Sequence, residues 1–191
     1  MTSSDELSPL IKPLESLQRL LNRFSGRGMI IGGVAASLLG KPRLTADLDA
    51  VILLSPENVP LLIEIAREEG MSPRLENADE FARRHHILLL RHVETGIPID
   101  ISLGMLPMEV EAVERSIEYP LGELIIRLPT PEDLIILKAV AHRPKDLADI
   151  QAVIDNHPDL DRARIKYWVK EFADTLEMPE ILDDVAVWLE E

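Results

Sequence analysis

The chain has 191 residues, no cysteine and a formal net charge of −14 at pH 7. The lack of cysteine excludes disulfides, thiolate metal sites and cysteine nucleophiles, so any metal must be bound by oxygen or imidazole. The net negative charge argues against binding of nucleic acid over a broad surface, because affinity for phosphate backbones comes chiefly from clustered Lys and Arg. A hydrophobic fraction of 46% predicts one α/β body with a helical extension.

No segment approaches the roughly 20 consecutive apolar residues that a membrane-spanning helix needs. Residues 1–10 are polar and lack the basic and then apolar order of a signal peptide. We therefore expect a soluble, cytoplasmic protein with no membrane partner.

The first half of the chain alternates helical and strand patterns. Leucines at helical spacing follow Pro13, which suits a first helical turn, and short apolar runs interrupted by glycine follow them. We expect a helix over 13–24, a strand over 29–31, a turn at Gly32 and Gly33, a helix over 34–39, a strand over 46–54, and a helix from Ser55 or Pro56 to a stop at Gly70.

A charged stretch without periodicity then leads into two strand candidates joined by a turn, which predict an antiparallel hairpin. Thr130, Pro131 and Asp133 are typical of a helix start. We expect strands over 87–91 and 97–103, a helix over 107–117, a strand over 124–128, a helix from 131 through 141, and helices to the end. Strands give way to helices near Pro129, so we expect a core over 1–128 with an N-terminal helix, and a helical extension over 129–191 packed on it.

Asp47 and Asp49 are alternate residues of a predicted strand, so they share a face about 6.6 Å apart along it. They can converge on one ion, and Mg²⁺ prefers carboxylate oxygens together with water and substrate phosphates. Asp100 lies within the second strand of the predicted hairpin. The alternative is that Asp47 and Asp49 are ordinary solvated side chains on a solvent-facing edge of the sheet.

Gly32 and Gly33 precede a predicted helix, where free backbone amides and the lack of side chains suit a phosphate. The alternative is a tight turn with close packing.

The Gly32-Gly33 pair, the short helix, Thr45-Ala46-Asp47-Leu48-Asp49 and the later Ile99-Asp100-Ile101 resemble the polymerase-β-like nucleotidyltransferases. The later segments Pro129 to Asp133, Lys138, and Arg143 to Asp146 with Asp149 are similar to the helical part of minimal nucleotidyltransferases that include abortive-infection and toxin-antitoxin toxins.

This resemblance implies a mixed α/β sheet with flanking helices and transfer of a nucleoside monophosphate from a nucleoside triphosphate to a hydroxyl acceptor, on RNA or protein. It implies that Asp47 and Asp49 bind two ions of Mg²⁺ or Mn²⁺, and that Asp100 binds the catalytic one and helps to activate the attacking hydroxyl. A cognate antitoxin is the protein partner that it suggests. Many members have Gly-Ser where this chain has Gly33, which removes a hydroxyl that commonly contacts a terminal phosphate. Pro98 cannot donate to a sheet ladder, so the strand that carries Asp100 is expected at an edge or bulged.

Two lysines are further candidates for binding the triphosphate. Lys138 interrupts an apolar stretch, so its ammonium must either reach solvent or face an anion. Lys145 is a second candidate, with a solvated bridge to Asp149 at i,i+4 as the alternative.

The densest cationic stretch is a candidate substrate contact or an ordinary solvated turn. His85 and His86 within it point apart if the segment is extended, which favours solvated or packed imidazoles over metal ligands. The stretch consists of Arg83, Arg84, His85, His86, Arg91 and His92.

Two other interpretations stay open beside the enzyme. One is a catalytically weak nucleotide-binding or regulatory module that acts through a protein partner. The other takes the acidic C-terminal helices as an interaction surface for a cognate partner such as an antitoxin.

Overall fold

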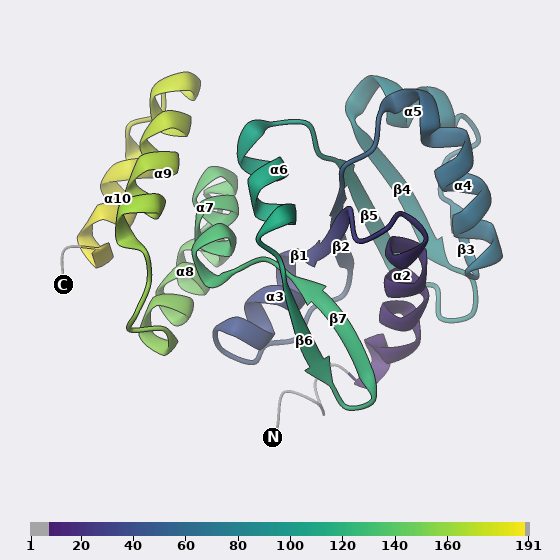
Figure 1. Ribbon diagram of the computed structural model, residues 1–191, viewed down its shortest axis with the longest axis horizontal. Coiled ribbons are helices and arrows are strands. Elements are labelled where there is room, and N and C mark those ends of the chain that lie inside the picture. Colours follow the sequence, from purple (N-terminus) through teal and green to yellow (C-terminus); the bar gives the residue numbers. More distant parts are fainter. Residues whose placement is uncertain (1–7, 190–191) are drawn as a thin grey trace.

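The computed structural model describes residues 8–189 as a mixed sheet flanked by helices, with a bundle of C-terminal helices at one end (Figure 1). Within this part of the chain, no helix is long and apolar enough to cross a membrane.

The main sheet has five strands in the order β1-β2-β5-β4-β3. β2 and β5 are parallel, and the other neighbouring strands are antiparallel. This arrangement confirms the predicted α/β class with a mixed sheet. The strands are β1 (Gly28–Ile31), β2 (Leu48–Ile52), β3 (Met71–Pro73), β4 (Ile87–His92) and β5 (Pro98–Leu103).

Helices pack on this sheet through apolar faces that their sequences predict. In α2 (Ile11–Arg23), preceded by the 3₁₀ turn η1 (Ser8–Leu10), the side chains of Leu14, Leu17 and Leu21 are buried. Four further helices pack on the sheet. α3 (Gly32–Leu39) contacts β1 and β2, and α6 (Pro107–Glu114) contacts β2. α4 (Val59–Glu68), which follows the 3₁₀ turn η2 (Pro56–Asn58), contacts β3, and α5 (Ala78–His85) contacts β4.

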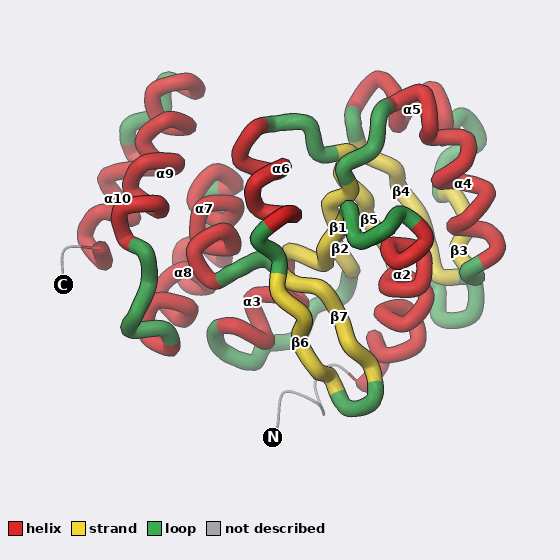
Figure 2. The backbone as a smooth tube through the Cα atoms, viewed as in Figure 1, coloured by secondary structure: helices red, strands yellow, loops and turns green. Residues whose placement is uncertain are grey.

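A separate hairpin leads from α6 to the C-terminal helices (Figure 2). It pairs β6 (Ile117–Leu121) with β7 (Leu124–Leu128), and β7 also lies against β1 and α2. The helices that follow are α7 (Pro131–Ala141), α8 (Pro144–Asn156), α9 (Arg162–Leu176) and α10 (Glu180–Leu189). The Thr130 hydroxyl accepts a hydrogen bond from the Asp133 backbone amide at 3.2 Å, which is the predicted cap of α7.

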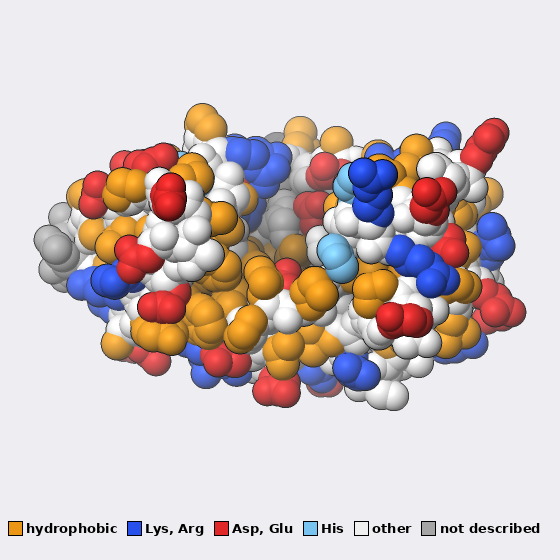
Figure 3. All heavy atoms as spheres, turned by 90° about the horizontal axis from the view of Figure 1, so that it is seen from above, with side chains coloured by type: hydrophobic (Ala, Val, Ile, Leu, Met, Phe, Trp, Pro, Cys, Tyr) orange, Lys and Arg blue, Asp and Glu red, His pale blue; other side chains and the backbone are white. Residues whose placement is uncertain are grey.

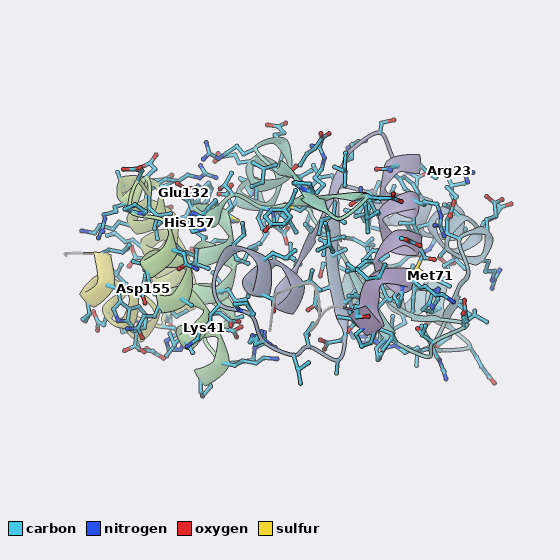
Figure 4. All side chains as sticks on the ribbon, turned by 90° about the horizontal axis from the view of Figure 1, so that it is seen from below. Arg23, Lys41, Met71, Glu132, Asp155 and His157 are labelled. Atoms are coloured by element: carbon cyan, nitrogen blue, oxygen red, sulfur yellow. The ribbon has the colours of Figure 1, made fainter. Side chains whose placement is uncertain are left out.

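The C-terminal helices are attached to the sheet mainly through α3, which both α7 and α8 contact. His157, after the end of α8, donates from Nε2 to the carbonyl oxygen of Leu39 at 2.8 Å, and Asn156 donates to the carbonyl oxygen of Gly40. Seen from below, Lys41 lies beside the C-terminal helices together with His157, while Arg23 and Met71 lie at the opposite end of the molecule (Figure 4).

Three predicted elements differ from the structure. The stretch 71–86 is not irregular, because β3 forms on the edge of the sheet and α5 packs its buried Ala78 and Ala82 inward. The helix predicted to reach Ile117 ends at Glu114, and Ile117 instead begins β6. The strand predicted over 46–54 covers only Leu48–Ile52, so Asp47 precedes it.

The prediction that Pro98 marks an edge or a bulge is wrong. β5 lies between β2 and β4 in an unbroken register, and Pro98 is its first residue, where a missing amide is tolerated. The expected turn at Gly32 and Gly33 is also shorter than predicted, because both glycines already belong to the first turn of α3.

Candidate active site

Asp49 and Asp100 lie directly opposite each other on the parallel strands β2 and β5. Along β5, Ile99, Ile101 and Leu103 are buried, whereas the residues between them are half-buried on the other face. Paired residues on adjacent strands project to the same side of a sheet. The sheet therefore places two carboxylates side by side.

Asp47 precedes β2 and is exposed, yet its charge acts on both strand acids. The Thr45 hydroxyl donates to Oδ1 of Asp47 at 3.0 Å, which orients this carboxylate although Asp47 lies outside the paired strand. The negative charges of all three predicted acids therefore act on one another.

Gly32 and Gly33 approach this group so closely that side chains cannot be added there. Gly32 has φ of +66°, and a Cβ on it would overlap the Asp49 carboxylate, with the Asp49 Cγ at 2.7 Å. A Cβ on Gly33 would overlap the Thr45 side chain, whose own Cβ would be 2.9 Å away. The first turn of α3 is therefore held against Thr45 and Asp49, with backbone amides at the site.

The pKa values of both strand acids reflect this crowding. Burial raises the pKa of the Asp49 carboxyl, the charges of Asp47 and Asp100 raise it further, and Lys138 and Arg143 only partly oppose them. Burial also raises the pKa of Asp100, although the charge of Arg74 counteracts it. The ionised site thus carries an excess of negative charge that a cation would relieve.

Arg74 supplies one such cation from the protein itself. It follows β3, and its Nη2 forms an ion pair with Oδ1 of Asp100. Each side chain retains about a third of its exposure, at 30% and 32% respectively.

Lys138 is buried on α7 and binds two carboxylates of α8. Its Nζ donates to Asp146 Oδ1 at 2.9 Å and to Asp149 Oδ2 at 2.8 Å. The Lys138 ammonium therefore faces anions and does not reach solvent, and these anions are carboxylates of its own chain. Its charge still reaches Asp49, whose pKa it lowers.

Two less buried arginines complete the cluster around Lys138. Arg43 forms a bidentate pair with Asp149, Nε to Oδ1 at 2.8 Å and Nη2 to Oδ2 at 2.9 Å. Arg143 pairs with Asp146 through Nε at 2.5 Å and Nη2 at 3.2 Å. The cluster joins α7 and α8 to the segment that precedes Asp47.

These pairings take the place of the bridge between Lys145 and Asp149 that was the alternative to a substrate role for Lys145. Asp149 is buried and already holds Arg43 and Lys138, whereas Lys145 is exposed near the start of α8.

The predicted cationic stretch does not form one surface. Arg83 pairs with Asp79 along α5, and the His85 ring packs on Phe81 with centroids 4.4 Å apart. His86 ends α5 with a left-handed φ of 55°. Arg91 and His92 lie at the other end of β4, where His92 is buried and its Nδ1 is 2.9 Å from the Thr95 hydroxyl.

Seen from above, the surface is hollowed between the C-terminal helices and the α5 side of the sheet (Figure 3). Acidic side chains lie in the wall of this hollow, and Lys or Arg side chains lie on both rims. A cavity of about 540 Å³ lies elsewhere, at the carboxyl ends of β2 and β5 beside α6, and none of the three acids lines it.

The three acids fit a hard divalent cation such as Mg²⁺ or Mn²⁺, because they offer carboxylate oxygens without imidazole, and burial raises the pKa values of Asp49 and Asp100. Within residues 8–189, no group of three Asp, Glu or His side chains is spaced so that it could hold a metal ion. Mg²⁺ does not require such a group, because it usually retains waters and shares substrate phosphates.

A comparison with protein-family models matches residues 19–185 to the family described as "Nucleotidyl transferase AbiEii toxin, Type IV TA system". The chain belongs to this family. No curated protein matched the AbiEii-family chain in a sequence search.

Among solved structures, the AbiEii-family chain is similar to an antigenic nucleotidyltransferase-like protein from Paracoccidioides brasiliensis. The two are 15% identical with a TM-score of 0.55, and the match covers 94% of this chain and 93% of the other. At that identity the likeness shows the nucleotidyltransferase-like fold alone.

Sequence reasoning did not identify Arg43 and Arg74 as members of the site. Arg43 is 106 residues from its partner Asp149, and Arg74 is 26 residues from Asp100. No local motif marks either arginine, and only the strand register and the packing of α8 could have identified them.

Proposed function

We propose that this AbiEii-family protein transfers a nucleoside monophosphate from a nucleoside triphosphate to a hydroxyl acceptor in a reaction that depends on Mg²⁺ or Mn²⁺. The observation that carries the proposal is the pairing of Asp49 with Asp100 on adjacent parallel strands, directly against Gly32. RNA and protein are the two acceptor classes.

Asp47, Asp49 and Asp100 would hold the metal. A bound divalent cation lowers the pKa of the acceptor hydroxyl and neutralises charge that grows on the transferred phosphate. Asp100 has the further role of helping to activate the acceptor hydroxyl by receiving its proton. The acceptor oxygen then bonds to the α-phosphorus, the bond to the bridging oxygen breaks, and pyrophosphate leaves in line.

Gly32 and Gly33 would bind phosphate oxygens through backbone amides at the start of α3. Lys145, which is exposed near the start of α8, would bind the triphosphate directly. Buried Lys138 would act mainly through its charge, which already reaches Asp49, and by holding Asp146 and Asp149 in place.

A catalytically weak nucleotide-binding module is the alternative, and one observation favours it. The Arg74 guanidinium already holds an oxygen of Asp100, which is the proposed proton acceptor. Such a module would act through a protein partner, and a cognate antitoxin is the partner that a type IV toxin-antitoxin family suggests.

The transfer reaction can be tested by incubating the purified chain with Mg²⁺, each α-labelled triphosphate, and total cellular RNA and protein. Label should enter one acceptor class, and Asp49→Asn should abolish the transfer. Asp174→Asn is the matched control, because it removes one exposed carboxylate of an i,i+4 pair on α9. Absence of transfer by the wild type with every triphosphate would favour the regulatory alternative.

Binding can be separated from catalysis by thermal unfolding. A triphosphate should raise the melting temperature only with Mg²⁺ or Mn²⁺, and Asp47→Asn with Asp49→Asn should remove the shift. Without metal, Asp49→Asn should be at least as stable as the wild type, because it removes the buried charge and the repulsion that together raise the Asp49 pKa. A marked loss of stability would show that Asp49 is a structural hydrogen-bond acceptor instead.

A further inference from the structure

One row of residues crosses the sheet from its β3 edge to the two strand acids. The Arg74 amide donates to the Leu89 carbonyl at 2.9 Å, which extends the β3–β4 register by one residue. Leu89 pairs with Asp100, and Asp100 pairs with Asp49. Residues opposite one another share a face, so the row carries Arg74 to the same side as both acids.

Across this row, Arg74 reaches over Leu89 to bind Asp100. The guanidinium Nη2 contacts Oδ1, while the buried Nε has no hydrogen-bond partner in the described part of the chain. A buried N–H without a partner costs free energy, so this pose of Arg74 does not satisfy all of its donors. The contact is therefore a single ion pair between Nη2 of Arg74 and one oxygen of Asp100, without the bidentate geometry in which a guanidinium holds a carboxylate most strongly.

We propose that Arg74 is the resident counter-cation of Asp100 and competes with the divalent cation for this carboxylate. The inference rests on the proposed function, since it assumes that Asp100 is a metal ligand. A guanidinium and a metal ion cannot both lie close to one oxygen without strong repulsion, so the metal must displace Arg74 or bind beside it at a cost. Arg74 thereby positions Asp100 before the metal binds and weakens metal binding.

The competition can be measured with Mn²⁺ alone, by titrating the full chain and following free Mn²⁺ by electron paramagnetic resonance. Arg74→Gln should bind Mn²⁺ about tenfold more tightly, because one adjacent positive charge is gone. Arg83→Gln is the matched control. It removes the same charge from a more exposed pair on α5, so Mn²⁺ affinity should change less than about twofold. A merely structural role of Arg74 would instead weaken Mn²⁺ binding in Arg74→Gln.

Urea unfolding without metal tests the ion pair independently. Arg74→Gln should lower the urea midpoint in the wild-type background and change it little in an Asp100→Asn background. If Arg74→Gln folds poorly, Arg74→Lys keeps a cation without the planar fork and should bind Mn²⁺ with intermediate affinity.

Equal Mn²⁺ affinity in wild type and Arg74→Gln would overturn the role of Arg74 and leave the metal site standing. Failure of Mn²⁺ to bind either protein would overturn the metal site of the proposed function together with the competition. An equal drop in urea midpoint in both backgrounds would show that Arg74 stabilises the fold without Asp100, which would also overturn the proposal.

Discussion

Gly32 shows how a single backbone position can shape the site. Its left-handed φ disfavours any side chain, and the Asp49 carboxylate occupies the place of a Cβ. We expect Gly32→Ala to lower the free energy of unfolding by about 2 kcal/mol more than Gly122→Ala, because overpacking adds to backbone strain. Gly122 has φ of +64° and nothing within 4 Å of the place where a Cβ would lie, so it reports the strain alone.

Urea unfolding of the two alanine variants measures this difference. Equal losses in both would show that the Asp49 side chain moves aside freely, and that the close approach of α3 does not hold it in place.

Lys138 is the second decisive residue, because it is buried between two carboxylates. Lys138→Met should cost about 3 kcal/mol of stability at pH 7, since removing one partner leaves charge buried. Lys145→Met makes the same change on an exposed site and should alter stability by less than about 0.5 kcal/mol. Similar losses in the two variants would contradict the buried role of Lys138.

The stability difference between wild type and Lys138→Met should depend on pH. Burial alone would raise the pKa values of Asp146 and Asp149, but hydrogen bonds from Arg143 and Arg43, with those from Lys138, lower them overall. A carboxyl group whose pKa is lower in the folded protein than in the unfolded chain stabilises the fold fully above its unfolded pKa of 3.8. This stabilisation is lost as the pH falls through the pKa of the folded state. The difference should therefore be full at neutral pH and shrink below pH 3.8, which thermal unfolding across pH can measure.

At the scale of elements, the connection from α3 to β2 has little regular structure of its own and depends on α8. Arg43, which lies in this connection, binds both carboxylate oxygens of Asp149 through its planar guanidinium. Arg43→Lys keeps the charge but loses the bidentate geometry. We expect amides of residues 41–47 to exchange hydrogen faster in this variant, and nucleotide transfer to fall with them.

Hydrogen exchange read by mass spectrometry checks this expectation, with Arg83→Lys as the control for a single-contact pair on α5. Unchanged exchange over residues 41–47 would show that other contacts hold the connection.

At the scale of the whole molecule, the packing of α7 and α8 on α3 predicts cooperative unfolding of the core over 1–128 with the extension over 129–191. Both tryptophans, Trp168 and Trp188, lie in the extension, so tryptophan fluorescence reports it alone. Circular dichroism reports helices of both parts. We expect the two probes to give the same urea midpoint.

A lower midpoint by fluorescence would show that the extension unfolds before the core. In that case the boundary near Pro129 would separate two folding units, and the Lys138 cluster would not couple them.

Local patterns in the sequence determined much of the sheet and of the acid site. The alternation along β5, the hairpin with β4, the glycines that begin α3 and the cap at Thr130 all arise from neighbours within a few residues. These features follow from side-chain period and backbone freedom, which the order of residues encodes directly.

Only the tertiary structure decided which charges meet. The pairing of Arg74 with Asp100 depends on strand register, and that of Arg43 with Asp149 spans 106 residues. Lys138 had two possible environments from its sequence, and the packing of α8 against α7 selected the buried one between Asp146 and Asp149. Edge strand β3 and helix α5 were likewise missed, because their short apolar patterns gain stability only from burial against β4 and α4.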